Sequence, residues 1–477
     1  MDNKQEKNKS LFKNIVLFFL ASFVPKTISF FMVPLYTHCL TTEQYGNIDL
    51  ITTTVQLLLP ILTLQVQDAI LFFSMDRKQN PGEVLSIGLW ICMGGFALLI
   101  VGTSAMLVSG AVLLEWTYIA FFLLHYFISA LANAISYFAR AIGKVKSITV
   151  SSVITCLITV ASNLLFLLVF NWGVNGYLLA NILGHLISLV YLCASVRIDQ
   201  YIVLRISNPG LIKRVILFSL PMVVSGLAWW INNSLDKYIL AFFCGASATG
   251  LLAVAYKIPT IVSLLGSTVS RAFSVSVLRN FAVKDEDGFL GNSYEMISFL
   301  MVLGSSGLML INIPLSGILF QNSFYAAWQL VPPLLVSATM NHVSLSCQNI
   351  CMAMGKTKLI SSTAMVGAAV NIVLNLCMIP KMGAYGAAVA TAVGFFVVWL
   401  VRYVWVKKNT ELKNNSVREI ISYVILWGQM VLAYWGNSFI VIQLVFCLML
   451  PVLYFNEILG ISKTILMKIF DRVQKRR

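Results

Sequence analysis

Lys26, Lys237, Lys257 and Arg271 are basic residues within or beside long apolar stretches of the chain. A charge at bilayer depth is costly, so we expect most of these side chains to face water rather than lipid. Arg presents a planar fork of donors and Lys a point charge, and both suit a pyrophosphate group. These four residues are therefore the predicted cationic site for an anionic ligand.

Polar residues accompany the charges on the predicted helices. Lys257 and Arg271 are separated by 14 positions, which at about 100° per residue returns them to nearly one helix face, roughly 21 Å apart. Trp, Asn and hydroxyl side chains suit sugar rings and hydroxyl groups. The predicted sugar-facing residues are Ser22, Ser29, Ser225, Trp229, Asn232, Asn233 and Thr268.

Asp236 and Asp68 are the candidates for coupling transport to H⁺ or Na⁺, and we expect no other cofactor. Asp49 and Asp68 also fit ordinary interfacial positions. A structural alternative exists for the lysines, because Lys26, Lys237 and Lys257 can snorkel to the headgroup layer or pair with Asp236.

The histidines and cysteines are spaced as packing residues rather than as metal ligands or catalytic groups. The four histidines (His38, His125, His185 and His342) lie on separate predicted helices, and the nine cysteines contain no CxxC pair. We therefore expect neither a metal site nor a catalytic constellation.

The elements that carry these residues are membrane helices. The sequence is 59% hydrophobic and 11% charged, with a mean hydropathy of +0.86, which indicates an all-α integral membrane protein. Its apolar runs predict about fourteen spans. Their ranges are 15–38, 45–72, 84–110, 114–138, 148–170, 174–196, 214–243, 250–277, 293–321, 327–352, 360–379, 384–406, 417–435 and 438–458.

Basic residues fall on alternate loops, as Arg140, Lys144 and Lys146 do after the fourth predicted span, whereas Lys381 is an exception among the outer connections. The positive-inside rule then predicts a multi-pass plasma-membrane protein with both termini in the cytoplasm. It also accounts for the net charge of +15 without nucleic acid, because anionic lipids attract these loops. The tail at 461–477 is predicted to be a basic amphipathic cytoplasmic helix.

An internal repeat divides the predicted spans. The sequence reads AIGKVK at 141–146 and AMGKTK at 353–358, and Asn163 and Asn375 follow the two glycines at equal distance. This pattern predicts two pseudo-symmetric six-helix lobes in the same orientation, with a substrate site between them. The predicted boundaries are 1–210 for spans 1–6, 211–410 for spans 7–12, and 411–460 for two C-terminal spans.

The chain reads NNSLDKYIL at 232–240 and AYKI at 255–258, and VPLYT at 33–37 with EQYG at 43–46. With these motifs it resembles the polysaccharide flippases of the multidrug, oligosaccharidyl-lipid and polysaccharide exporter superfamily, which includes MATE-like transporters and lipid II flippases. The resemblance implies a MATE-like fold whose lobes alternate between inward-open and outward-open states. It also implies translocation of a polyprenyl-diphosphate-linked oligosaccharide repeat unit, for O-antigen or capsule, across a bacterial inner membrane.

The same resemblance implies a transporter rather than an enzyme, with membrane lipids, a polysaccharide polymerase and glycosyltransferases as partners. Two rivals stay open. A MATE-type cation-coupled drug antiporter would favour carboxylates in its cavity, whereas a membrane glycosyltransferase, polymerase or ligase would need catalytic residues on a sizeable outer loop. The sugar, the length of the lipid carrier, the coupling ion and the oligomeric state are left open by the sequence.

Overall fold

The computed structural model describes residues 23, 25–76, 78–110, 115–203, 209–280, 285 and 288–454, and these residues are helical apart from short connections. The chain forms two compact units, Met1–Tyr238 and Ile239–Arg477. The first unit contains α2 (Val33–Cys39), α3 (Thr42–Leu62), α4 (Val66–Met75), α5 (Pro81–Val108), α6 (Trp116–Ala141), α7 (Val145–Asn163), a π-helical turn (Leu164–Val169) and α8 (Gly173–Val196). A short 3₁₀ turn (Ile198–Gln200) follows α8, and α9 (Pro209–Ala255) continues into the second unit.

The second unit contains α10 (Pro259–Asn280), α11 (Phe289–Leu310), α12 (Asn312–Leu319), a 3₁₀ segment (Asn322–Leu330), α13 (Val331–Ala353), α14 (Thr357–Asn409), α15 (Ser416–Ala433), a short 3₁₀ turn (Gly436–Phe439) and α16 (Ile440–Leu453). Among the described residues, nine helices are long and apolar enough to cross a membrane, or ten if the bent pair α3–α4 is one span. Each of the fourteen predicted ranges contains helix in the described part of the chain. The prediction of an all-α membrane protein is confirmed.

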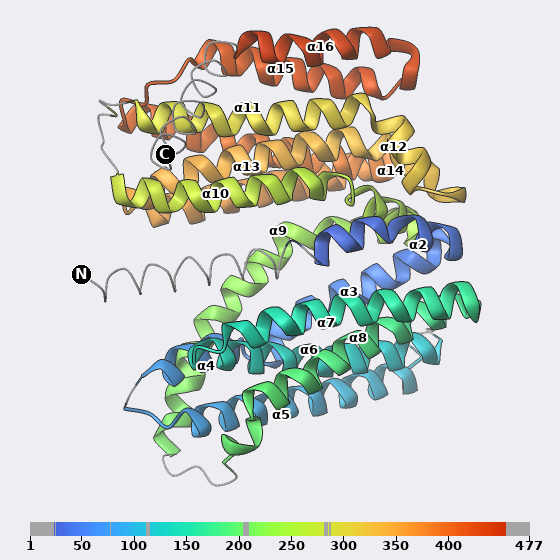
Figure 1. Cartoon of the computed structure of the whole chain (residues 1–477), viewed down its shortest axis with the longest axis vertical. Coiled ribbons are helices and arrows are strands. Elements are labelled where there is room, and N and C mark those ends of the chain that lie inside the picture. Colours follow the sequence, from blue (N-terminus) through green and yellow to red (C-terminus); the bar gives the residue numbers. More distant parts are fainter. Residues whose placement is uncertain are drawn as a thin grey trace, which may run out of the picture. The chain divides into compact units, whose positions relative to one another are not determined.

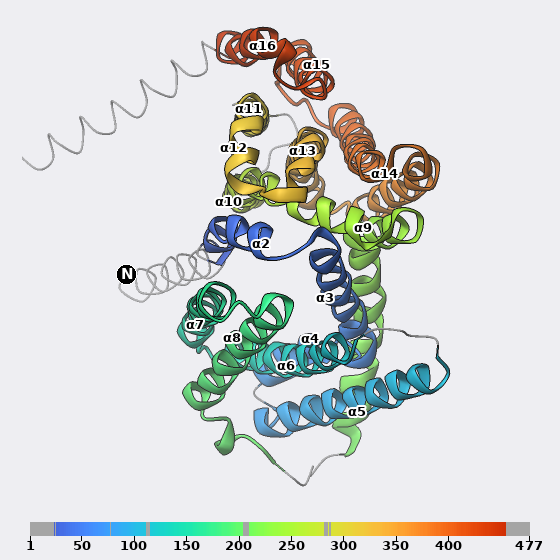
Figure 2. The same ribbon diagram turned by 90° about the vertical axis from the view of Figure 1, so that its right-hand side faces the viewer.

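Two of the long helices are bent sharply at a glycine. The helix α14 holds the predicted spans 360–379 and 384–406, whereas α9 holds the span 214–243 and only the first residues of the span 250–277. Gly245 in α9 has φ 79° and ψ 175°, and Gly383 in α14 has φ 57° and ψ −137°. Both conformations lie in a region that L-residues with a Cβ rarely enter. The bend in α9 is visible in the second view of the chain (Figure 2).

The predicted span 250–277 is interrupted in the structure. The range 250–277 is not one continuous helix, because α9 ends at Ala255 and α10 begins at Pro259. Pro259 has no N–H to donate into a preceding turn, and it disfavours helical geometry at the residue before it. Lys257 therefore lies in the connecting turn, and the predicted single stripe joining it to Arg271 is wrong.

The predicted span 45–72 is bent by 52° between α3 and α4. Leu64 and Gln65 occupy the left-handed region there, with φ of 49° and 52°. Gly95 of α5 lies against this bend, where a Cβ would stand 2.2 Å from the carbonyl oxygen of Leu62. Only glycine permits so close an approach between α5 and the bend.

The two GKxK turns have matching backbone structure. Gly143 and Gly355 have φ of 78° and 70°. The N–H of Lys144 donates to the carbonyl of Ala139 at 2.8 Å, and that of Lys356 donates to Cys351 at 3.0 Å. These are equivalent bonds five residues back along the chain, which supports the predicted repeat.

The helix pairs that follow these turns also pack alike within each unit. A Cβ on Gly184 of α8 would lie 2.0 Å from Thr159 Oγ1 of α7, and a Cβ on Gly394 would lie 3.1 Å from Asn371 Cβ within α14. Thr159 and Asn371 stand equally far past the repeated glycines. A glycine therefore lies at a close contact in each pair.

We expect Gly184→Ala to destabilise the protein by about 1–3 kcal/mol, because the added methyl group overlaps Thr159 and the backbone of α7. The measurement is thermal unfolding of the detergent-solubilised chain. Gly102→Ala in α5 is the matched control, since a Cβ there meets nothing within 4 Å. Equal unfolding temperatures for the two variants would contradict this account of the packing.

Candidate functional site

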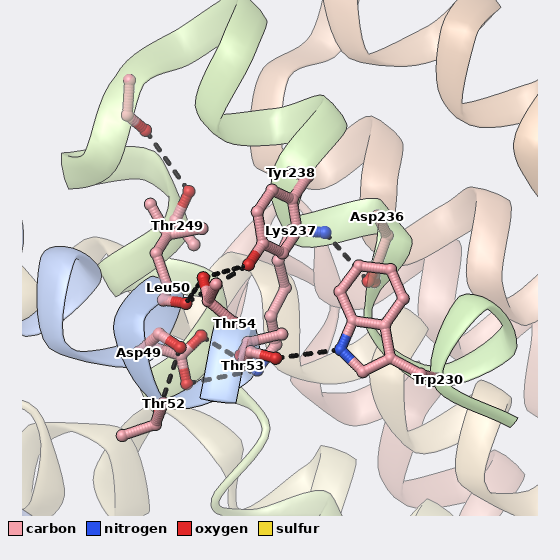
Figure 3. Close-up of polar contacts among 11 residues, drawn as sticks. Asp49, Leu50, Thr52, Thr53, Thr54, Trp230, Asp236, Lys237, Tyr238 and Thr249 are labelled. Atoms are coloured by element: carbon pink, nitrogen blue, oxygen red, sulfur yellow. Dashed lines mark hydrogen bonds and ion pairs between the residues drawn. The ribbon is translucent and has the colours of Figure 1, made fainter. Parts of the chain in front are cut away.

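A buried polar cluster joins α3 to α9 within the first unit (Figure 3). Lys237 Nζ lies 2.9 Å from Asp49 Oδ2 and donates to Oδ1 at 3.1 Å. The two side chains are only 17% and 20% exposed. At this degree of burial each charge depends on the other, because removing one leaves the second poorly solvated.

Neutral groups beside this ion pair also join α3 to α9. Trp230 Nε1 donates to the carbonyl of Thr53 at 2.9 Å, and the hydroxyl groups of Tyr238 and Thr54 are hydrogen-bonded to each other. The Trp230 and Tyr238 rings pack 5.4 Å apart. The cluster therefore fixes the face of α9 that carries Lys237 against α3.

Asp236 is also buried, and its Oδ1 accepts the backbone N–H of Lys237 at 2.9 Å. The side chain of Lys237 pairs with Asp49 instead. Of the other residues on the predicted stripe of α9, Ser225 and Asn233 are exposed. Trp229 and Asn232 lie in the same helix.

Arg271 lies on an exposed face of α10 in the second unit, together with Thr268. The opposite face of α10 packs on α13. There, Gly266 lies against the ring of His342, and Asn349 Nδ2 donates to Ser270 Oγ at 3.2 Å. This packing determines which way Arg271 points, and no carboxylate of the described residues forms an ion pair with it.

The other predicted residues lie on other segments of the chain. Lys26 is exposed and Ser29 half-buried on the helical residues that precede α2, whereas Ser22 lies outside the described residues. Lys257 is half-buried in the turn between α9 and α10. Asp68 is half-buried in the first turn of α4. The roles assigned to these residues stay predictions.

Sequence reasoning did not identify the partner of Lys237. Asp49 precedes Lys237 by 188 positions, and no local pattern connects them. The spacing of Asp49 and Thr53, four residues apart on a predicted helix, was the available signal of a polar face. The sequence gives no sign that His125 and His185 are neighbours, but their rings lie 5.4 Å apart. No group of three metal-ligating side chains occurs among the described residues.

A family model described as polysaccharide biosynthesis protein matches residues 11–275, which is more than half of the chain. The chain belongs to this family. An uncharacterized membrane protein of Methanocaldococcus jannaschii is 31% identical over 80 residues, a match covering 17% of this chain and 15% of that protein.

Solved structures with the same fold are transporters and a flippase. Lipid II flippase MurJ in an inward closed conformation has a TM-score of 0.72 at 13% identity, covering 93% of this chain and 100% of its own. An inward-facing multidrug resistance MATE family transporter of the MOP superfamily has a TM-score of 0.62 at 11% identity, covering 83% and 97%. A MOP superfamily transporter from Pyrococcus furiosus has a TM-score of 0.55 at 13% identity, covering 83% and 95%. The predicted MATE-like fold is confirmed.

Asp49→Asn should lower the stability of the chain by about 1–3 kcal/mol, because it leaves the Lys237 charge half-buried without its counterion. Asp49→Asn combined with Lys237→Gln should recover part of that loss, since no unpaired charge then remains. Thermal unfolding of the two single variants and the double variant measures the coupling. Strictly additive losses would show that the pair contributes nothing.

Proposed function

We propose that this protein is a flippase that carries a polyprenyl-diphosphate-linked oligosaccharide repeat unit from the inner to the outer leaflet of a bacterial plasma membrane. The motion would be alternating access, and the product would serve cell-surface polysaccharide synthesis. Membership of the polysaccharide biosynthesis family and the fold shared with a lipid II flippase support this proposal. The basic loops support cytoplasmic termini.

The observation that carries the proposal is which cations within the apolar part of the chain are ion-paired and which are exposed. Lys237 is neutralised by Asp49. Arg271 and Lys26 are exposed, and neither is ion-paired with a carboxylate of the described residues. An uncompensated cation at bilayer depth is strongly disfavoured unless it faces water or an anionic ligand. Arg271 and Lys26 are thus the residues best suited to a diphosphate.

Each part of the proposed substrate needs a different kind of partner in the protein. The diphosphate needs positive charge to leave the headgroup layer, and an arginine fork matches its oxygen atoms. The oligosaccharide needs hydroxyl and amide partners, which Ser225, Asn233 and Thr268 offer from exposed positions. The polyprenyl chain is apolar and can stay in contact with lipid throughout.

An apolar groove in the second unit also suits the lipid chain. It has a volume of about 860 Å³ between α14 and α15, and its lining includes Phe396, Trp399, Leu400 and Trp427. A polyprenyl chain would replace lipid contacts there with aromatic and aliphatic contacts. The groove supports a substrate with a long hydrocarbon part.

A drug antiporter for cationic compounds fits these residues less well. Such a protein needs carboxylates free to attract cations, whereas Asp49 is paired with Lys237 and Asp236 is buried. The P. furiosus structure is described as having a binding pocket of reverse polarity that suggests a different function. Different pocket polarities therefore already occur on this fold.

We expect Arg271→Ala to slow flipping by about tenfold or more, since it removes a charge-assisted hydrogen bond to the diphosphate. The assay follows the appearance of a lipid-linked oligosaccharide in the outer leaflet of proteoliposomes. Arg271→Lys should keep part of the rate, because the charge remains without the fork. Lys26→Ala should also slow flipping.

Lys358→Ala is the matched control, because Lys358 is an exposed lysine in the GKxK turn and has no assigned role in binding. Its flipping rate should equal that of the unmodified protein. Normal flipping by the Lys26→Ala, Arg271→Ala double variant, at equal protein level, would refute the proposed role of these cations.

A further inference from the structure

The N-terminal turn of α15 carries a buried carboxylate that the proposed substrate site does not use. Glu419 is 1% exposed. Its Oε2 accepts a hydrogen bond from Asn414 Nδ2 at 3.0 Å, whereas its Oε1 is buried and has no hydrogen-bond partner among the described residues. A buried carboxylate with one neutral donor is incompletely compensated.

A neighbouring acid and base already neutralise each other. Glu295 of α11 is buried and forms an ion pair with Arg418, and its other oxygen accepts the N–H of Asn415. The Arg418 guanidinium also lies over the Tyr454 ring, 4.5 Å from its centroid. The charge of Arg418 is thus matched by Glu295.

Lys407, in the last turn of α14, is a second cation close enough to Glu419 to interact with it electrostatically. Its Nζ donates to the carbonyl oxygens of Leu412 and Asn414, at 3.1 and 3.5 Å, and it makes no ion pair with Glu419. The N-terminus of α15 adds only a fraction of a positive charge. The other titratable groups that face Glu419 from α11, α13, α14, α15 and α16 are neutral thiol or phenol groups: Tyr294, Cys347, Tyr403, Tyr423 and Tyr454.

A second oxygen beside Glu419 is also unused. Asn414 Nδ2 donates to both Tyr403 Oη, at 2.9 Å, and Glu419 Oε2, which fixes the orientation of the amide. Asn414 Oδ1 is buried without a partner among the described residues. Two oxygens that have no hydrogen-bond partner among the described residues, one on Glu419 and one on Asn414, therefore accompany one incompletely compensated negative charge.

We propose that Glu419 and Asn414 form a binding site for one monovalent cation, H⁺ or Na⁺. A bound proton would neutralise the carboxylate, and a bound Na⁺ would do so while using both free oxygens. Either ion offsets the free-energy cost of burying an ionised Glu419 carboxylate in the protein interior. Asp68 and Asp236, the candidates from the sequence, lie in the first unit, so this site is a separate one.

The site lies where α15 packs against α11 and the end of α14. Ser298 of α11 is hydrogen-bonded to Tyr423 of α15 at 2.7 Å, and Ser306 donates to Gln429 at 2.7 Å. Figure 1 shows α15 and α16 running alongside α11. Loss of the cation would leave the ionised Glu419 carboxylate without a counterion at one end of the interface between α15 and α11. This would weaken the interface. A role in ion coupling rests on the proposed flippase function, whereas ion binding itself does not.

The test is thermal unfolding of the purified full-length protein in detergent, with no substrate present. NaCl is titrated against choline chloride at constant ionic strength, and the pH is varied separately in choline chloride. The unfolding temperature should rise by about 2 °C per tenfold increase in the bound ion once the site begins to fill. A response to Na⁺ alone identifies Na⁺, and a response to pH alone identifies the proton.

Glu419→Gln should abolish this response, because the neutral amide keeps the shape of the side chain but needs no cation. Glu411→Gln is the matched control, since Glu411 is exposed on the preceding loop, and it should respond like the unmodified protein. Asn414→Asp should move the midpoint to a cation concentration about tenfold lower, because it adds a second negative charge. An ion response that is the same in Glu419→Gln and the unmodified protein overturns the proposal.

Flipping in proteoliposomes with an imposed gradient of the identified ion then tests coupling. Glu419→Gln should retain flipping without a gradient and lose the acceleration that the gradient gives. If Arg271→Ala leaves flipping unchanged while Glu419→Gln still loses the ion response, the substrate assignment fails and the cation site stands. If flipping depends on Arg271 and neither ion stabilises the protein, the cation site fails alone.

Discussion

A charge in an apolar surrounding must be paired, hydrogen-bonded or wet, and this constraint explains where the charged residues of this chain lie. Lys237 and Arg418 are ion-paired with Asp49 and Glu295. Arg402 is buried among neutral acceptors, donating to Thr363 Oγ1 at 2.9 Å and to Ser344 Oγ at 3.0 Å. Arg271 is exposed and forms no ion pair with a carboxylate of the described residues, so its charge is available to an anionic ligand of the kind proposed.

The sequence predicted the helical framework because membrane spans are specified locally. Twenty or so apolar residues must form a helix in lipid whatever their neighbours are, so each predicted range contains helix. The pairing of Lys237 with Asp49, by contrast, depends on how α3 and α9 pack, and the nearby Asp236 was the only local alternative. Pro259 was the overlooked signal for the break that separates Lys257 from α10.

The repeat was also predictable, but a different basic residue joins the two helices of the repeated pair in each unit. In the first unit, Lys144 of the GKxK turn donates from Nζ to the carbonyls of Ser195 and Val196, both at 3.0 Å, at the end of α8. In the second unit, Arg402 reaches from the end of α14 back to the carbonyl of Ile360 at 3.3 Å. Each helix pair is thus tied by one cation, supplied from opposite partners. The matching glycines could be read from the sequence, but this exchange could not.

The elbow between α3 and α4 has a mechanical consequence. Leu64 and Gln65 hold left-handed conformations, which cost roughly 1–2 kcal/mol each in residues other than glycine. The bend between α3 and α4 therefore stores backbone strain. Packing against α5 and α9 keeps it bent, as the close approaches of Gly95 to Leu62 and of Gly226 to Pro60 indicate. If these helices separate, the strain favours straightening of the membrane crossing that carries Asp49.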